Sequence, residues 1–309
     1  MRAPTTAASN AAVDPPRARE GRGPLLDLVR LSPLMDLTAG SREVVVGLID
    51  GPVAVDHPDF AKLSMRTLSE RPAACTVRDA SCVHGTFVAG ILSARRGTVV
   101  PAVCPGCTLL LRPIFGGSRQ SHDVPAATPE ELAAAMHECI EGGAQILNVS
   151  AELTRSRGQE QRALVQVLDL AAHRGVVVVV AAGNQRVITS STLTRHPWVV
   201  SVVAYSRSGH PMASSTLGRS IGQRGLGAPG EDVTSLAPGG GRVQLGGSST
   251  AAPFVAGAAA LLRSEFPRVA GAEVRFALTT GAGRRRRGVV PPLLDAWSAY
   301  QTIAARQRR

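Results

Sequence analysis

Residues 175–184 constrain the fold of this chain more than any other stretch. They read Gly-Val-Val-Val-Val-Val-Ala-Ala-Gly-Asn, an uninterrupted β-branched run that ends at a glycine and a polar amide, Asn184. A run of this kind is typical of a strand buried on both faces, as in the parallel sheets of α/β proteins. A second apolar run, residues 43–51, ends in a similar way at Asp50 and Gly51. These strands predict a parallel sheet whose carboxyl ends carry the functional side chains.

Strand and helix patterns alternate along the rest of the chain. We expect further strands at residues 108–114, 144–150 and 199–204, and helices at residues 82–92, 130–141, 159–174, 251–264, 271–280 and 291–303. Residues 212–247 are rich in Gly and Pro and show little strand pattern. The alternation predicts an α/β fold, a three-layer α/β/α sandwich with a mainly parallel central sheet.

The chain reads as one domain with two short extensions. Residues 1–23 are rich in Ala, Pro and Arg and are predicted to be disordered. The domain covers residues 24–303 and begins with a broken helical segment at residues 24–37, whereas residues 304–309 form a short basic tail.

A glycine-rich approach to an Ala-rich helix contains two serines, Ser248 and Ser249. A hydroxyl at a helix N-terminus lies beside unpaired N–H groups and the positive end of the helix dipole, which favour the negative charge of acyl transfer. Proline is tolerated in the first helical turn, so Pro253 predicts a helix start near Ser249 or Thr250. Ser249 is then the candidate nucleophile and Ser248 lies just outside the helix. A capping serine without chemistry is the alternative.

Four polar side chains are predicted at the ends of strands or helices: Asp50, His84 in the first turn of its helix, Asn184 and Ser249. A serine hydroxyl attacks well only when an imidazole accepts its proton, and a buried carboxylate orients that imidazole. An amide side chain and the backbone N–H of Ser249 would bind the oxyanion. The combination predicts a serine hydrolase that works by acyl transfer.

The words around these residues resemble the subtilisin-like serine proteases, or subtilases. The aspartate motif is residues 46–51 with His57-Pro58-Asp59-Phe60 after it, the histidine motif is residues 84–90, the oxyanion motif residues 181–184 and the serine motif residues 247–253. The resemblance covers residues 40 to 300. It implies that Asp50 orients the imidazole, His84 is the general base and acid, Ser249 is the nucleophile and Asn184 is an oxyanion donor.

The same resemblance implies a peptide-binding cleft. An extended substrate would pair with Ser150, Ala151 and Glu152, and the first pocket would be floored by Ala181, Ala182 and Gly183. Glu152 stands where many relatives have glycine. It either selects a basic residue next to the scissile bond or is an exposed loop glutamate.

A narrower resemblance links the chain to the cyanobactin-type proteases that mature ribosomally made precursor peptides. It rests on residues 104–110, 194–198 and 220–226, and it implies a precursor peptide as the substrate. Some of these relatives transfer the acyl group to an amine and make macrocycles, usually with a long insertion that this chain lacks between His84 and Asn184. A catalytically silent scaffold that binds peptides is a further alternative.

Composition sets limits on partners and location. Lys and Arg number 34 against 23 Asp and Glu, but only 3% of residues are aromatic, which favours a solvated tail or an acidic partner over nucleic acid. We expect no contact with a membrane, because no apolar run is long enough to span one. Only about 40 residues precede the first strand, too few for a secretion signal and a folded propeptide, so a cytoplasmic protein is expected. The oligomeric state is left open.

The five cysteines allow several arrangements. Cys75 and Cys82, with Cys104 and Cys107, could bind zinc through four thiolates, form two disulfides or remain free thiols. The other histidines and the acidic residues show no ligand spacing. We therefore expect no cofactor and assign no metal-ligating residues.

Overall fold

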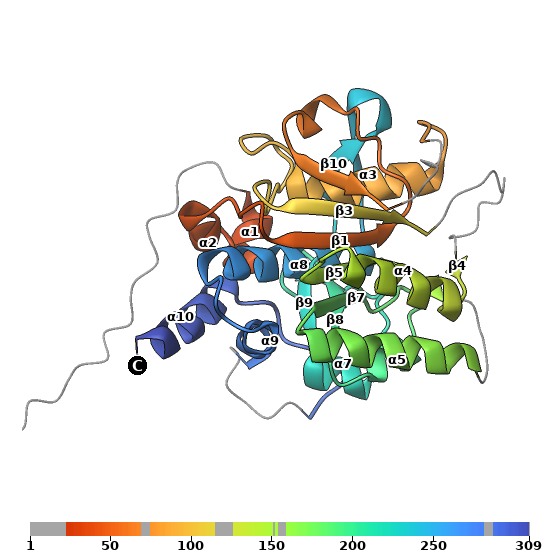
Figure 1. Ribbon diagram of the computed structural model, residues 1–309, viewed down its shortest axis with the longest axis vertical. Helices are drawn as coiled ribbons and strands as arrows, with labels where there is room; N and C mark the ends of the chain where they lie inside the picture. Colours follow the sequence, from red (N-terminus) through yellow and green to blue (C-terminus); the bar gives the residue numbers. More distant parts are fainter. Residues whose placement is uncertain are drawn as a thin grey trace, which may run out of the picture.

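The computed structural model describes residues 23–68, 75–114, 126–150, 152–153, 159–280 and 287–308. Its centre is a parallel sheet of seven strands in the order β2-β3-β1-β5-β7-β8-β9 (Figure 1). Their bounds are β2 (Ser64–Thr67), β3 (Thr108–Pro113), β1 (Val45–Asp50), β5 (Ile146–Val149), β7 (Val177–Ala181), β8 (Val200–Tyr205) and β9 (Leu226–Pro229). All five strands expected from the sequence are present, with bounds that differ from the expected ones by at most three residues.

The expected helices are present, α5 and α9 with the expected bounds and the others with shifted ends, and the short helices α6 and α7 were not expected. The helices of the described residues are α1 (Pro24–Leu28), α2 (Ser32–Leu37), α3 (Ala80–Ser93), α4 (Pro129–Glu141), α5 (Gln159–Arg174), α6 (Thr192–Arg195), α7 (Arg219–Arg224), α8 (Ser248–Glu265), α9 (Gly271–Thr280) and α10 (Ala296–Gln307), with single 3-10 turns at Pro58–Phe60 and Pro238–Gly240. The broken helix expected at residues 24–37 is confirmed as α1 and α2. The last helix begins and ends later than expected. Residues 1–22 lie outside the described residues, so the disorder expected for residues 1–23 stays a prediction.

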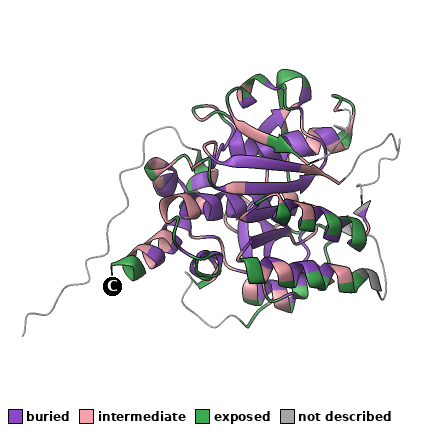
Figure 2. Cartoon of the chain, in the orientation of Figure 1, coloured by how far each residue is buried: buried purple, intermediate pink, exposed green. Residues whose placement is uncertain are grey.

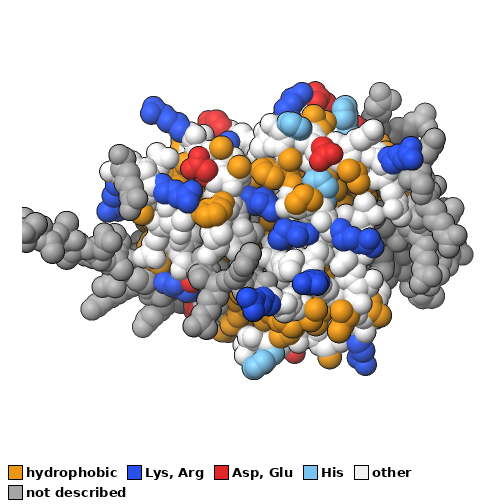
Figure 3. Space-filling model, turned by 90° about the horizontal axis from the view of Figure 1, so that it is seen from below, with side chains coloured by type: hydrophobic (Ala, Val, Ile, Leu, Met, Phe, Trp, Pro, Cys, Tyr) orange, Lys and Arg blue, Asp and Glu red, His pale blue; other side chains and the backbone are white. Residues whose placement is uncertain are grey.

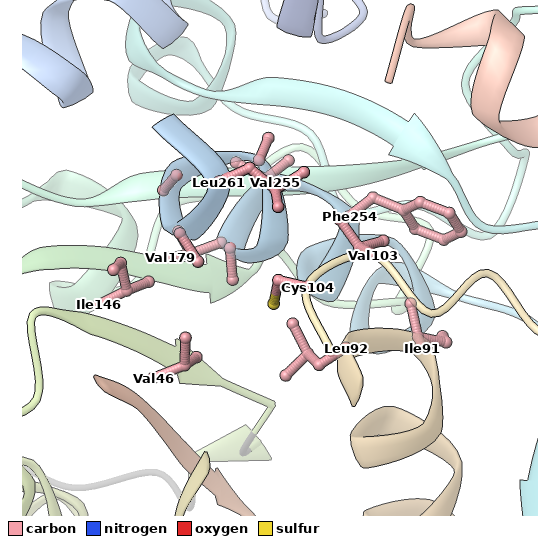
Figure 4. Packing of buried hydrophobic residues seen from close by; sticks show 14 of the residues in the cluster. Val46, Ile91, Leu92, Val103, Cys104, Ile146, Val179, Phe254, Val255 and Leu261 are labelled. Carbon is pink, nitrogen blue, oxygen red and sulfur yellow. The ribbon is translucent and has the colours of Figure 1, made fainter. Parts of the chain in front are cut away.

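Side chains that alternate along the strands divide the core into two halves, one on each face of the sheet. Val46, Ile146 and Val179 point to the face covered by α3 and α8, where they join Ile91, Leu92, Val255 and Leu261 (Figure 4). Leu147, Val149 and Val178 point to the opposite face, which α4 and α5 cover. The central strands are buried on both faces (Figure 2), as their uninterrupted apolar runs predict, whereas the edge strand β2 is half-buried or exposed. The three-layer α/β/α sandwich is confirmed.

The expectation of little strand structure at residues 212–247 is wrong. This stretch contains β9 and an antiparallel hairpin of β10 (Val233–Ala237) and β11 (Gly241–Leu245). Short strands that contain Gly and Pro carry a weak sequence signal. In β9, Gly227 leaves the room that the Tyr205 ring occupies, and Pro229 stands at the end of β9, which is an edge strand of the sheet.

The hairpin holds the helix that carries His84. Ser235 of β10 is fully buried and donates a hydrogen bond from its hydroxyl to the carbonyl oxygen of Phe87 in α3, at 2.7 Å. A side chain at Gly90 would overlap Ser235. Helix α3 is therefore packed between the sheet and the hairpin.

The cysteines adopt a mixed arrangement. Cys75 and Cys82 form a disulfide with a Cα–Cα distance of 5.2 Å, whereas Cys104, Cys107 and Cys139 are buried free thiols. Burial raises the pKa of the Cys139 thiol to about 12. Four-thiolate zinc and two disulfides are both wrong for this set, because the two pairs differ in state. Among the described residues no group of three or more His, Cys, Asp or Glu is placed to hold a metal ion.

The described helices are too short or too polar to cross a membrane.

Candidate active site

The aspartate and the histidine meet where β1 ends and α3 begins. Asp50 is the last residue of β1 and is 1% exposed. Its Oδ1 accepts hydrogen bonds from the backbone N–H of Gly51 and from Nδ1 of His84, both at 2.6 Å. Two bonds to one oxygen hold the carboxylate in a single orientation, while its buried Oδ2 has no hydrogen-bond partner among the described residues.

Glycines on both sides allow this close approach. A Cβ on Gly51 would overlap the carbonyl oxygen of Ser81, and one on Gly85 would overlap the carbonyl oxygens of Gly51 and Pro52. The backbones of β1 and α3 therefore touch at the point where Asp50 and His84 face each other. A larger residue at either glycine would force the two elements apart.

The position of His84 differs slightly from the sequence expectation. Helix α3 begins at Ala80, after the Asp79 side chain accepts the N–H of Ser81 at 2.9 Å. His84 is the fifth residue of the helix and so lies in the second turn instead of the first. Its Nε2 is 2.9 Å from Oγ of Ser249, and about a third of its side chain is exposed (31%).

Burial separates the two serines. Ser248 is 1% exposed and Thr250 is 1% exposed, but Ser249 between them is half-buried and reaches the surface. The Ser248 hydroxyl accepts the N–H of Gly183 at 3.0 Å. Ser249 is therefore the serine that both contacts His84 and is open to a substrate.

The start of α8 differs from the expectation. The helix begins at Ser248, with Gly247 as its cap at φ 117°, so Ser248 lies inside the helix and Pro253 is its sixth residue. The left-handed φ of Gly247 allows this early start. A Cβ there would lie 2.9 Å from Nδ2 of Asn184.

The Asn184 side chain lies beside this cap. Its Oδ1 accepts the backbone N–H of Ser248 at 2.9 Å. Because that N–H must face an acceptor, the bond fixes which way round the amide lies. The Nδ2 donor is left on the other side of the amide. Asn184 is exposed.

The pKa of His84 reflects two opposed influences. Burial lowers it, but the negative charge of Asp50 and the hydrogen bond to that carboxylate together raise it above the ordinary value of 6.5. The pair thus stabilises a protonated imidazole, the form that would exist after the imidazole has taken a proton from serine.

Two short strands border the site. β4 (Ala126–Ala127) and β6 (Glu152–Leu153) form a separate parallel pair. The Ser150 hydroxyl, just before β6, accepts from Nδ2 of the buried Asn148 at 3.1 Å. Ala151 and the side chain of Glu152 lie outside the described residues. Ala181 ends β7, and Ala182 and Gly183 continue it toward Asn184.

Thr86 supports the site and was not singled out from the sequence. It is fully buried, and its hydroxyl accepts the backbone N–H of Ala54 at 2.9 Å. Ala54 lies in the loop after Asp50, so this bond ties the histidine helix to the aspartate loop. Its place two residues after His84 in the histidine motif was the available signal.

Residues 41–297 match the Subtilase family. The chain belongs to the subtilase family. Subtilisin DY of Bacillus licheniformis is 30% identical to it over 244 residues, which is 77% of this chain and 83% of the relative. Subtilisin E of Bacillus subtilis (strain 168) is 30% identical over 245 residues, 77% of this chain and 60% of the relative. The chain is a subtilisin-like serine endopeptidase with the geometry of an Asp-His-Ser triad.

Solved structures of maturation proteases are also similar to this subtilase. A mutant of the protease domain of PatA superposes with a TM-score of 0.77 at 32% identity, covering 86% of this chain and 97% of that one. The prenylagaramide maturation protease PagA gives a TM-score of 0.75 at 26% identity and covers 88% and 98%. A lanthipeptide protease shares the fold, with a TM-score of 0.74 at 22% identity over 91% and 94%.

Proposed function

We propose that this subtilase matures a ribosomally made precursor peptide by cleaving it at an internal peptide bond, with Asp50, His84, Ser249 and Asn184 as the catalytic residues. The contact series from Asp50 Oδ1 through His84 to Ser249 Oγ carries the proposal. The similarity to PatA and PagA supports the substrate class.

Each residue has one role in the proposed reaction. Ser249 Oγ attacks the carbonyl carbon of the scissile bond while Nε2 of His84 takes its proton. The oxyanion that forms accepts hydrogen bonds from the backbone N–H of Ser249 and from Nδ2 of Asn184. The imidazolium then gives its proton to the departing amine.

Water completes the proposed cycle. It attacks the acyl-enzyme, His84 takes a proton from it, and the same proton returns to Ser249 as the acid product leaves. Asp50 keeps its charge throughout and stabilises the imidazolium. No metal or cofactor takes part in these steps.

Labelling with a fluorophosphonate probe tests the nucleophile. We expect the wild-type chain to be labelled and Ser249→Ala to remain unlabelled, with turnover lowered by about 10⁶. Ser248→Ala is the matched control, since it removes the neighbouring buried hydroxyl, which accepts the N–H of Gly183. This variant should still be labelled. Labelling of Ser249→Ala equal to that of the wild type would overturn the assignment.

Mass spectrometry of peptide products tests the reaction. A synthetic peptide library is incubated with the wild type and with Ser249→Ala, and the fragments are read out. Linear fragments that carry the added water, in the wild type only, support an endopeptidase. Cyclic products that lack that water would show transfer to an amine instead.

The same library tests Glu152. If the carboxylate lies in the cleft, Glu152→Ala loses a preference for Arg or Lys next to the scissile bond, because an opposite charge in a shielded pocket favours a basic side chain. Identical preferences in the two proteins would make Glu152 an ordinary loop residue.

A further inference from the structure

The guanidiniums of two arginines bind one loop at the amino edge of the sheet, and a third arginine, Arg195, stands at the start of that loop. Arg224 of α7 donates from Nη2 to the carbonyl oxygen of Arg195, at 2.8 Å. Arg275 of α9 donates from Nε to the carbonyl oxygen of Trp198 at 2.7 Å and from Nη2 to that of Pro197. The loop lies at the amino edge because Trp198 Nε1 bonds the carbonyl oxygen of Val176, just before β7 begins.

These guanidiniums are not neutralised by carboxylates. Arg195 donates only to the carbonyl oxygen of Ser190, and no ion pair of the described residues involves Arg195, Arg224 or Arg275. The carboxylate that reaches this loop is Asp169, and it is paired with His196 at 3.2 Å. The cluster therefore carries a net positive charge held in fixed positions.

The cluster is also partly desolvated. Burial lowers the pKa of Arg275, and the charge of Arg224 lowers it further, so the two guanidiniums repel each other. Nε of Arg224 is buried and has no acceptor among the described residues. Like charges held together in a partly buried position are relieved by an anion that binds between them.

The surroundings show an open basic face. Figure 3, seen from below, looks onto the side where Figure 1 has α5 and α7, and Lys and Arg side chains gather in its middle with apolar side chains around them. Arg195 is exposed, and Arg224 and Arg275 are half-buried. An approaching chain can therefore reach all three.

We propose that Arg195, Arg224 and Arg275, the arginine cluster, bind an acidic segment of the peptide substrate, remote from the scissile bond. The proposal rests on the proposed function, because only a long substrate such as a precursor peptide can reach both the active site and a second contact at the amino edge. A peptide fits better than a nucleic acid, because the aromatic ring of the cluster, Trp198, is covered by the Arg275 guanidinium at 5.2 Å. That face of the ring is not open to a stacking base, and the ring also packs against the core of the protein.

The position of the cluster sets a minimum spacing. Ser249 lies at the carboxyl edge of the sheet and the cluster at the amino edge, so the five residues of β7 separate them by about 17 Å. An extended chain covers at most about 3.5 Å per residue. At least about five residues must therefore lie between the acidic segment and the cleaved bond, and more if the chain follows the surface.

Direct binding is the first test. A fluorescein-labelled peptide of alternating Gly and Glu is titrated with Ser249→Ala protein, with fluorescence anisotropy as the readout. The double variant Arg224→Gln/Arg275→Gln should bind at least about tenfold more weakly, since two charge-assisted contacts are lost. Arg42→Gln/Arg308→Gln removes the same charge from exposed positions elsewhere and should bind as before. Equal weakening by both double variants would show that the peptide responds only to the net charge of the protein, and this would overturn the proposal.

A second variant protects the test against loss of folding. Arg195→Glu reverses a charge at the rim but leaves the carbonyl bonds of Arg224 and Arg275 in place, so it should melt like the wild type and still bind about tenfold more weakly. Unchanged binding by Arg195→Glu in a folded protein, or tighter binding of a single-stranded oligonucleotide than of the peptide, would overturn the proposal.

Kinetics separate this inference from the proposed function. Two cleavable peptides are compared in active protein, one short and one extended by an acidic tail beyond a spacer of about ten residues. The tail should lower KM in the wild type and not in Arg224→Gln/Arg275→Gln, while the short peptide is cut equally by both. A tail effect of equal size in both proteins overturns the cluster. Failure to cut either peptide counts against the proposed function alone, because the binding test still decides on the cluster.

Discussion

The two edges of the central sheet handle charge in opposite ways. At the carboxyl edge, Asp50 and His84 form a pair joined by a 2.6 Å hydrogen bond. At the amino edge, Arg224 and Arg275 are bonded to backbone carbonyls and have no carboxylate partner within the described part of the chain. The Asp50–His84 pair is set for a reaction, whereas the guanidiniums of Arg224 and Arg275 are available to a ligand. The difference explains why one edge resembles an active site and the other a binding surface.

The largest expected loss of activity, and the strongest test of this contrast between the edges, is at Asp50. Asp50→Asn keeps the shape of the side chain but removes the charge that orients and stabilises the imidazolium, so turnover should fall by about 10⁴. The pH profile should change as well. In the wild type, kcat/KM should rise with pH through a raised His84 pKa, above 6.5.

Without the Asp50 charge only burial acts on His84, which lowers its pKa. The rise in kcat/KM of Asp50→Asn should therefore lie at lower pH than in the wild type, measured on one peptide across the pH range. A profile that does not move would mean that the pair is not the group that titrates. Arginine variants at the amino edge should leave this profile unchanged.

Asn184 comes next in size. Asn184→Ala removes one donor to the oxyanion, so kcat should fall by about 10² to 10³ with little change in KM. Because Oδ1 of Asn184 also accepts the N–H of Ser248, a thermal melt is needed beside the kinetics. A loss confined to KM would point to substrate binding instead of the transition state.

A pair of glycines compares the edges directly. Gly85 contacts the backbone of Gly51 beside the active site, and Gly271 contacts the backbone of Gly175 at the amino edge. A Cβ overlaps a carbonyl oxygen in both places, so Gly85→Ala and Gly271→Ala should each cost about 1 to 3 kcal/mol of unfolding free energy. Only Gly85→Ala should also lower the kcat of the folded protein. Equal kcat values would show that the spacing of β1 and α3 does not control His84.

The smallest effect is expected from the disulfide. Cys75 and Cys82 are seven residues apart, and closing a loop of that size stabilises a fold by about 2 to 3 kcal/mol in the chain-entropy treatment. Reductant should lower the melting temperature of the wild type by a few degrees and leave Cys75→Ser/Cys82→Ser unmoved. A reductant effect on the double variant would point to something other than this bond.

How far the sequence predicts the molecule depends on how local each feature is. The strands β1 and β7 were predictable because both faces are buried and their apolar runs are uninterrupted. The candidate site residues were predictable because each belongs to a short sequence motif whose glycines and small residues also fix the local backbone. They are Asp50, His84, Asn184 and Ser249. The hairpin β10–β11 was missed, since it lies in a stretch rich in Gly and Pro and the burial of β10 depends on α3.

The arginine cluster could not be predicted from local pattern. Its members come from α6, α7 and α9, and their partners are backbone carbonyls, which every residue has. The residue types alone therefore do not predict such a contact. Ser249 was preferred to Ser248 on the basis of a helix start that is one or two residues too late. Burial, which decides between the two serines in the structure, is a tertiary property.

Pro253 has a consequence for the cooperativity of α8. As the sixth residue of the helix it has no N–H to offer the carbonyl oxygen of Ser249. The turn that carries the nucleophile is thus one bond short of the helical ladder, and the N–H of Ser248 in the same turn is bonded outside the helix, to Oδ1 of Asn184. The amide-exchange rates of this turn should then resemble those of the residues around Asn184, and not those of the rest of α8. The position of Ser249 therefore depends on the contacts of its turn with Asn184 and His84 as well as on helix α8.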